Sequence, residues 1–224
     1  LTSASTLRDL TNDMQRKLSE GLKRSTLESY LQAAGTASDI VIRNLQRSAQ
    51  LVNGFKQVAV DQTTSQRRDF ALRTVVDEIA LTLQPSLSKL PYLLSSSIDD
   101  GIEMDSYPGP LGQVLTNLIN NAILHGFDGR DCGVIAITGR LVGGDRVELV
   151  VKDDGRGIPP AHLNHVFDPF FTTKLGRGGT GLGLNIVHGI VTGVLGGKNS
   201  VNTELGQGTA FTVLMPLRAP ANIS

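Results

Sequence analysis

The chain has 224 residues with 21 Lys and Arg against 21 Asp and Glu, so its formal net charge at pH 7 is zero. Without a net charge it has no overall field that would attract nucleic acid or an anionic membrane, and any anion must be held by a local site. The length admits one large domain, or a compact domain of about 150 residues with an appendage.

The single cysteine, Cys132, cannot form an internal disulfide, which favours a reducing compartment, and we expect a cytoplasmic location. No apolar run approaches the roughly 18 residues that span a bilayer, so we expect no membrane contact by these residues. The sequence starts without an initiator Met or a signal-peptide pattern. We therefore expect a fragment of a longer protein, which leaves a membrane anchor elsewhere in that protein open.

Apolar residues at helical spacing predict a first helix from Leu7 to near Gly21 and a second, much longer helix after it. Ser25 followed by Glu28 is a capping-box pattern for the start of the second helix. The apolar stripe of the second helix consists of Leu27, Leu31, Ala34, Ala37, Val41, Leu45, Ala49, Val52 and Phe55. Two helices cannot bury both apolar faces alone, so we expect a homodimer through helices 1–60. The alternative is a hairpin that folds back on the rest of the chain.

Polar residues at 61–69 predict a linker, so we place a helical-hairpin dimerisation domain at 1–62, a linker at 63–69, a second domain at 70–219 and a tail at 220–224. In the second domain, strands are predicted at 70–72, 92–98, 102–104, 134–141, 146–151, 200–205 and 209–215. Helices are predicted at 75–83, 111–125 and 181–194, with an irregular segment at 155–180. This order predicts an α+β fold, a two-layer α/β sandwich with a mixed, mostly antiparallel sheet, preceded by an α-helical hairpin.

The helix predicted at 111–125 has an apolar stripe and a polar stripe. The polar stripe recurs every four residues and consists of Gln113, Asn117, Asn121 and His125. Asn is a poor helix former, yet three Asn residues fall within 117–121, a cost that a function would offset. An amide oxygen can bind Mg²⁺ when phosphates share the coordination. The alternative is an ordinary solvated helix face.

Asp153 follows a predicted strand and precedes Gly155 and Gly157. A carboxylate at a strand end, beside glycines that permit close backbone approach, is suited to accept a hydrogen bond from a ligand such as an adenine amino group. The alternative is a common surface turn.

Two loop motifs follow. The segment 167–174 contains three of the seven Phe residues, and a loop with that much apolar surface must dock somewhere. Glycines at 176, 178, 179, 181 and 183 then lead into a helix. The unpaired N–H groups and the positive dipole end of a helix N-terminus are suited to bind phosphates.

Four motifs, taken in order, resemble the N, G1, F and G2 boxes of sensor histidine kinases: LTNLINNA, DDGRGIP, FDPFFTTK and GTGLGL. With the closing GGKNS and GQGTAF, the resemblance covers about residues 66–217. It implies the Bergerat ATP-binding sandwich, which that family shares with gyrase, Hsp90 and MutL-type ATPases. It also implies a catalytic region that donates the γ-phosphoryl group of ATP to a histidine, for relay to the receiver domain of a response regulator.

The resemblance implies residue roles as well. Asn121 would bind Mg²⁺, with Asn117 as its polar partner and His125 as a basic group near the phosphates, and these three would be catalytic. Asp153 would hold the adenine amino group above the turn of Gly155 and Gly157. The further ATP contacts implied are Ile158, Phe170, Thr173, Lys174, Gly179, Thr180, Gly181, Leu182, Gly183, Leu184 and Thr209. The segment 167–179 would form a lid over ATP.

Two features depart from relatives. The ATPases of the superfamily have a general-base Glu where this chain has Asn117, and an amide cannot accept a proton from an attacking water, which favours a kinase over a hydrolase. Histidine kinases carry the phosphoacceptor histidine in the dimerisation helices, yet no histidine precedes His125. We expect that histidine upstream of Leu1, and a fragment that binds ATP without autophosphorylation. The remaining histidines, His162, His165 and His188, are interpreted as surface or core residues.

Two other functions are compatible with these motifs. One is a kinase of the same fold that phosphorylates Ser in a partner, as anti-sigma kinases do, although the helical pair argues against it. The other is a dimeric, nucleotide-responsive interaction module without kinase activity, whose helices bind a response regulator.

Overall fold

The computed structural model describes residues 2–20, 23–64, 66–174 and 178–221, and the side chains of 2–3, 19–20, 43 and 46–64 fall outside that description. Contacts divide the chain into two compact units, Leu1–Asn53 and Gly54–Ser224. The domain limits predicted from the sequence stay a prediction.

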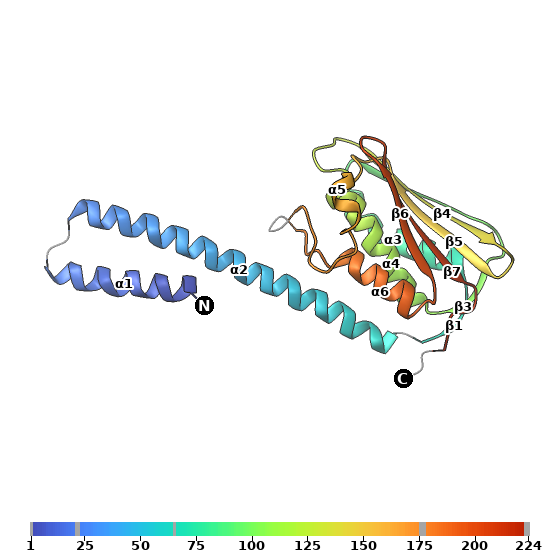
Figure 1. Ribbon diagram of the computed structural model, residues 1–224, viewed down its shortest axis with the longest axis horizontal. Helices are drawn as coiled ribbons and strands as arrows, with labels where there is room; N and C mark the ends of the chain where they lie inside the picture. The colour runs from blue at the N-terminus through green and yellow to red at the C-terminus, as the bar shows by residue number, and fades with distance from the viewer. Residues whose placement is uncertain (1, 21–22, 65, 175–177, 222–224) are drawn as a thin grey trace. The chain divides into compact units, whose positions relative to one another are not determined.

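The first unit contains α1 (Thr2–Glu20) and the first part of α2 (Arg24–Thr64) (Figure 1). The two helices meet at the hydroxyls of Thr11 and Tyr30, which are 3.1 Å apart, and Ala37 of α2 is buried. Because α2 begins at Arg24, Ser25 lies inside the helix and the predicted capping box is wrong. Glu28 instead forms an ion pair with Arg24 at 2.8 Å, since side chains four residues apart on a helix are neighbours.

Large apolar side chains remain uncovered on this helical pair. Leu31 and Leu45 are 60% and 65% exposed, and Leu18 and Ile42 are exposed as well. The side chains of Ala49, Val52 and Phe55, predicted to continue the stripe, lie outside the described residues. Among the described helices, none combines the length and the apolarity that crossing a membrane requires.

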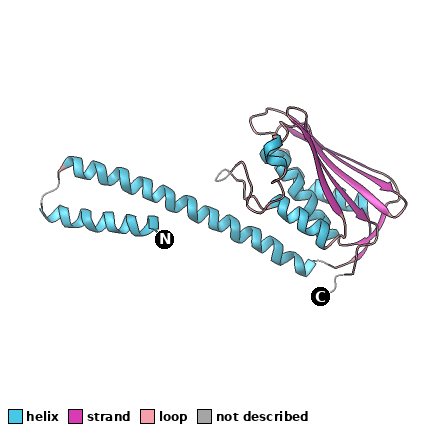
Figure 2. Cartoon of the chain, in the orientation of Figure 1, coloured by secondary structure: helices cyan, strands magenta, loops and turns pink. Residues whose placement is uncertain are grey.

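The second unit is a two-layer sandwich, in which helices cover one face of a five-stranded sheet (Figures 1 and 2). The strand order is β2-β4-β5-β7-β6. The strands are β2 (Tyr92–Ile98), β4 (Gly133–Val142), β5 (Arg146–Asp153), β6 (Lys198–Glu204) and β7 (Gly208–Pro216). Only the β2–β4 pair is parallel within this described sheet. The predicted mixed, mostly antiparallel sheet is thus confirmed.

The strands predicted at 92–98 and 102–104 belong to different sheets. β2 is paired along its whole length with β4, whereas β3 (Glu103–Ser106) pairs antiparallel with β1 (Arg68–Ala71). Most of the polar segment predicted as a linker therefore belongs to α2 and β1. Polar residues are tolerated there because β1 lies in a two-stranded sheet that leaves Arg68 and Asp69 exposed.

Three helices pack on the sheet: α3 (Leu72–Leu87), α4 (Pro108–Asn121) and α6 (Gly183–Gly193). α4 begins with Pro108, which suits the first helical turn because its missing N–H has no acceptor there. The buried side of α4 is formed by Leu111, Val114, Leu115, Leu118 and Ile119. Burying each such side chain contributes roughly 1.5–3 kcal/mol, so this side anchors α4 in the core and its polar side is left free to form a site.

Two local differences from the sequence expectation lie near the site. The helix predicted to continue regularly to His125 ends in a π-turn, η1 (Ala122–Gly126), closed by a 2.9 Å bond from the Phe127 N–H to the Ala122 carbonyl. The wider turn lets Phe127 enter the core beside Tyr92, with ring centroids 4.6 Å apart. The segment predicted as irregular contains a short helix, α5 (Pro160–Leu163).

Candidate functional site

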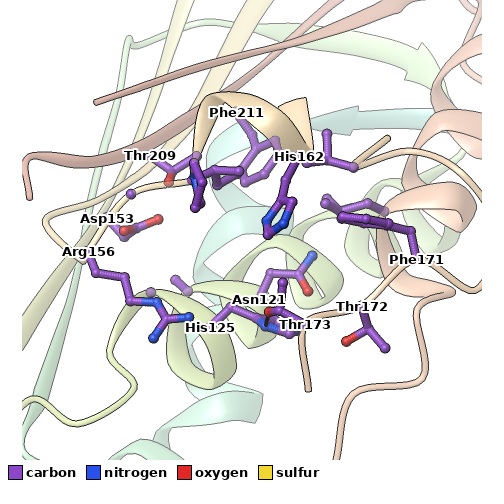
Figure 3. Close-up of a pocket in the computed structure, with 17 residues that line it drawn as sticks. Asn121, His125, Asp153, Arg156, His162, Phe171, Thr172, Thr173, Thr209 and Phe211 are labelled. Atoms are coloured by element: carbon purple, nitrogen blue, oxygen red, sulfur yellow. Dashed lines mark hydrogen bonds between the residues drawn. The ribbon is translucent and has the colours of Figure 1, made fainter. Parts of the chain in front are cut away.

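A cavity that is open to solvent lies among the end of β5, η1, α5 and the segment 171–173 (Figure 3). Of the residues singled out from the sequence, its lining brings together Asn121, His125, Asp153, Gly157, Ile158, Thr173, Leu184 and Thr209.

Asp153 is the last residue of β5 and is only 5% exposed. Burial raises the pKa of its carboxyl, although hydrogen bonds from the backbone N–H groups of Gly155 and Thr209 oppose this shift. The Gly155 N–H donates to Asp153 Oδ1 at 2.9 Å. A Cβ at Gly155 would lie 2.5 Å from that oxygen and 2.6 Å from the Gly126 carbonyl, so no side chain fits there. The arrangement presents a buried carboxylate, a strong acceptor, to a ligand in the cavity.

A second cavity adjoins the first and shares Asn121, Val166, Phe171 and Leu184 with it. Asn117 and Asn121 of α4 approach Gly183, the first residue of α6. A Cβ at Gly183 would lie 3.6 Å from Asn117 Oδ1 and 3.8 Å from both polar atoms of Asn121. Amide groups thus face a helix N-terminus, whose first N–H groups lack intrahelical acceptors. Such a place can hold an anion together with a cation bound by an amide oxygen.

Thr180 and Gly181 complete the wall of the second cavity. The Thr180 hydroxyl accepts a hydrogen bond from the Leu182 N–H at 3.2 Å, and Leu182 is the N-cap of α6. Gly181 has a φ of +70° and packs on the backbone of Phe170, so glycine is needed at this position both for its conformation and for its size.

The phenylalanines of 167–174 have three different positions. Phe167 docks in the core, with ring centroids 5.8 Å from His188 and 6.4 Å from Phe211. Phe171 lines both cavities. Phe170 has a left-handed backbone, φ +67°, and is 50% exposed. Because the chain turns at this residue, the structure brings Phe171, and not the expected Phe170, to the site.

A charged cluster borders the cavities. Asp128 accepts Lys174 Nζ at 2.5 Å and lies 3.3 Å from a guanidinium nitrogen of Arg156. Lys174 therefore lines a neighbouring groove rather than either cavity. His125 Nδ1 lies 3.3 Å from the Thr173 hydroxyl. Burial lowers the pKa of His125, and the positive charges of Lys174 and Arg156 lower it further, which favours the neutral imidazole.

Three expected contacts lie beside the cavities rather than on their walls: Gly155, Gly179 and Leu182. Gly176, in the middle of the glycine-rich run, lies outside the described residues. Residues that sequence reasoning missed include Arg156, His162, Phe171 and Phe211, all on the wall of the first cavity. Arg156, Phe171 and Phe211 are inside motifs quoted above and could have been found there, whereas the position of His162 depends on the turn of α5.

We expect Asp153→Asn to raise the free energy of unfolding at neutral pH, because it removes a buried charge while its amide oxygen can still accept the Gly155 N–H. The pKa of Asp153 in the folded protein lies above the usual 3.8. The loss of stability caused by burying its charge is therefore complete above the folded pKa and is relieved as pH falls through that value towards 3.8. The advantage of the variant should therefore shrink in that acidic window. Urea denaturation at several pH values measures this, with exposed Asp131→Asn as the control. A variant less stable than wild type at pH 7 would contradict it.

Comparison with known proteins places the chain in a family. The model of the histidine kinase-, DNA gyrase B-, and HSP90-like ATPases matches residues 107–219, half of the chain. The sensor histidine kinase RcsC of Escherichia coli (strain K12) is 33% identical over 171 residues, which cover 73% of this chain and 17% of RcsC. The chain thus spans about a sixth of the length of that relative.

Solved structures agree with this placement. The catalytic domain of the histidine kinase ThkA superposes with a TM-score of 0.58 at 26% identity, covering 68% of this chain and 97% of that domain. ThkA in complex with the response regulator protein TrrA superposes with a TM-score of 0.60 and covers 95% of this chain and 59% of ThkA, and at 21% identity this likeness concerns the fold alone. The chain belongs to the family of histidine kinase-, DNA gyrase B- and HSP90-like ATPases, and its second unit is an ATP-binding catalytic domain of the sensor histidine kinase type.

Proposed function

We propose that this chain binds ATP with Mg²⁺ and donates the γ-phosphoryl group to a histidine outside its catalytic unit, for relay to the receiver domain of a response regulator. One observation carries the proposal: the amides of Asn117 and Asn121 converge on the N-terminus of α6, beside a cavity whose wall holds the buried Asp153. The phosphates and the purine of ATP would then bind in adjoining parts of one site.

The first cavity, which contains Asp153, is the proposed nucleoside end. Asp153 accepts a hydrogen bond from the adenine amino group. Its carboxylate is a strong acceptor because it is buried away from water. Ile158 and Leu184 supply apolar walls for the base, and Gly157 and Thr209 lie on the same lining.

The second cavity is the proposed phosphate end, where Thr180, Gly181, Gly183 and the first N–H groups of α6 contact the phosphates. Asn121 suits Mg²⁺ because its side chain offers a neutral amide oxygen, and its Nδ2, buried without a partner among the described residues, is left to donate to a phosphate oxygen. The described residues contain no cluster of three or more His, Cys, Asp and Glu. Mg²⁺ bound here would take the Asn121 oxygen, phosphate oxygens and water, as is usual for this ion.

Phosphoryl transfer requires positioning and neutralisation of charge. A histidine nitrogen attacks the γ-phosphorus, the bond to the β–γ bridging oxygen breaks, and ADP leaves with that electron pair. Lys174 lines the groove that shares Leu124 and Gly178 with the phosphate end, and its positive charge lowers the cost of the negative charge gathered there. His125 and Arg156 line the adjoining nucleoside end. Asn117 cannot take a proton from water, so transfer is favoured over hydrolysis.

We also propose a homodimer through α1 and α2, which presents the acceptor histidine and the surface for the receiver domain. The uncovered apolar side chains Leu18, Leu31 and Leu45 support it, because such side chains on a two-helix hairpin are usually buried by a second copy. A cytoplasmic location is proposed as well, in line with the exposed, unpaired Cys132.

Asn121→Ala should weaken binding of Mg²⁺-ATP by at least about tenfold, because the ion loses its side-chain ligand, and should change binding of ATP in a chelator much less. Isothermal titration calorimetry with and without Mg²⁺ measures both affinities. Gln113→Ala, on the same helix but outside both cavities, serves as the matched control. Equal losses of ATP affinity with and without Mg²⁺ would show that Asn121 does not bind the ion.

With labelled ATP and Mg²⁺, the chain alone should gain no acid-labile label, because its first histidine in sequence is His125, in the catalytic unit. A histidine-bearing helical hairpin of a sensor kinase, added in trans, should gain acid-labile label. Acid-labile label on the chain alone would contradict the proposal. Acid-stable label on a partner serine would favour the serine kinase, and tight ATP binding without any transfer would favour the interaction module.

Leu31→Glu should weaken the dimer by tenfold or more, because burial of a Leu contributes roughly 1.5–3 kcal/mol and each dimer contains two copies. Sedimentation equilibrium over a concentration series measures the dissociation constant. Gln32→Glu, an exposed neighbour, should leave it nearly unchanged. A monomeric wild type at all concentrations would refute the dimer.

A further inference from the structure

Two buried side-chain atoms without a hydrogen-bond partner among the described residues belong to the lining of the cavity that contains Asp153: Asn121 Nδ2 and His162 Nδ1. Leaving such an atom unpaired is unfavourable, and native proteins keep one where a water, an ion or a ligand meets it. For Asn121 the proposed phosphate end supplies a reason, because a phosphate oxygen can accept a hydrogen bond from its Nδ2 group. The sequence interpretation of His162 as an ordinary surface or core histidine supplies none.

The position of His162 is determined by α5 and by Phe171. Its backbone N–H donates to the Pro159 carbonyl at 2.9 Å, and its ring meets Phe171 edge-on, with centroids 5.4 Å apart. Figure 3 shows the ring pointing from α5 into the cavity, towards the wall formed by Asn121. The imidazole as a whole is only half-buried, so rotation about its χ2 bond brings Nδ1 to a ligand without displacing α5.

The two cavities differ in what they offer, and His162 belongs to one of them. It lines the cavity of Asp153, Ile158 and Phe211, and it is not on the wall that holds Asn117 and Gly183. A neutral imidazole nitrogen can donate or accept one hydrogen bond, and a nucleoside carries ring-nitrogen acceptors and ribose hydroxyls. The phosphates belong to the other end of the site.

We propose that His162 is a further nucleotide-binding residue, whose Nδ1 hydrogen-bonds a ring nitrogen or a hydroxyl of the nucleoside part. This inference rests on the proposed binding of ATP. It assigns a recognition role to α5, a segment that sequence patterns place between two motifs and within neither.

Calorimetric titration of the full chain with Mg²⁺-ATP tests the assignment. His162→Phe keeps an aromatic ring against Phe171 but removes the nitrogen, and should weaken ATP binding about 3- to 10-fold, the loss of one hydrogen bond. His162→Asn carries its amide on Cγ, as His carries Nδ1, and should restore the affinity to within about twofold of wild type. His165→Phe changes an exposed histidine of the same segment that is outside the cavity lining but also packs on Phe171, with centroids 6.1 Å apart. Because it keeps an aromatic ring there, it should change the ATP affinity less than about twofold.

ATP analogues that each lack one ring nitrogen or one ribose hydroxyl identify the bonded atom. One analogue should bind wild type more weakly than ATP and lose no further affinity in His162→Phe. Three results would overturn the inference: His162→Phe binding ATP as tightly as wild type, His162→Asn being as weak as His162→Phe, or every analogue losing the same further affinity in His162→Phe. Failure of the wild-type chain to bind ATP would instead refute the proposed function itself.

Discussion

Apolar side chains along one side of α4 are buried against α6 and the sheet, and this packing decides where the polar groups of the site lie. With Leu111, Leu115 and Leu118 fully buried, rotation of α4 about its axis would expose several apolar side chains at once. Asn117 and Asn121 are therefore held towards the N-terminus of α6. The same core contains Val151 of β5, two residues before Asp153. One packed core therefore fixes the positions of the Asp153 carboxylate and of the Asn117 and Asn121 amides.

In the free site, the charged forms of Asp153 and His125 are both disfavoured, and two cations lie nearby. The cations suit a polyanionic ligand. The Asp153 carboxyl is buried at a cost, which is visible as its raised pKa. His125 is kept neutral by burial and by two neighbouring cations, and Asp128 holds Lys174 and Arg156 beside the cavities. Phosphates would bring new negative charge to this cluster and favour protonation of His125. Nucleotide binding is thus expected to raise the pKa of that imidazole.

Sequence patterns predicted the sandwich and most of the strands because alternation and helical spacing report directly which side chains enter the core. The ordered motifs and the closing strand likewise predicted that Asn121, Asp153 and Thr209 would share one site. All three line the same cavity, and their roles stay a prediction. Features that depend on unusual backbone conformations could not be predicted from the sequence. The π-turn before Phe127 and the left-handed backbone of Phe170 arise from tertiary packing, and neither has a local signal in the chain.

The same unusual conformations place the aromatic side chains of the segment 167–174. Phe167 is fixed in the core and Asn185 of α6 donates to its carbonyl at 3.1 Å, so the chain before Phe170 is anchored at this point. Beyond the left-handed turn, Phe171 lies over the cavity and packs on the ring of His162. A displacement of Phe171 would therefore also remove the ring that packs on His162. With His162 bound to the nucleoside as proposed, that contact and the position of Phe171 would be coupled, because the two rings pack on each other.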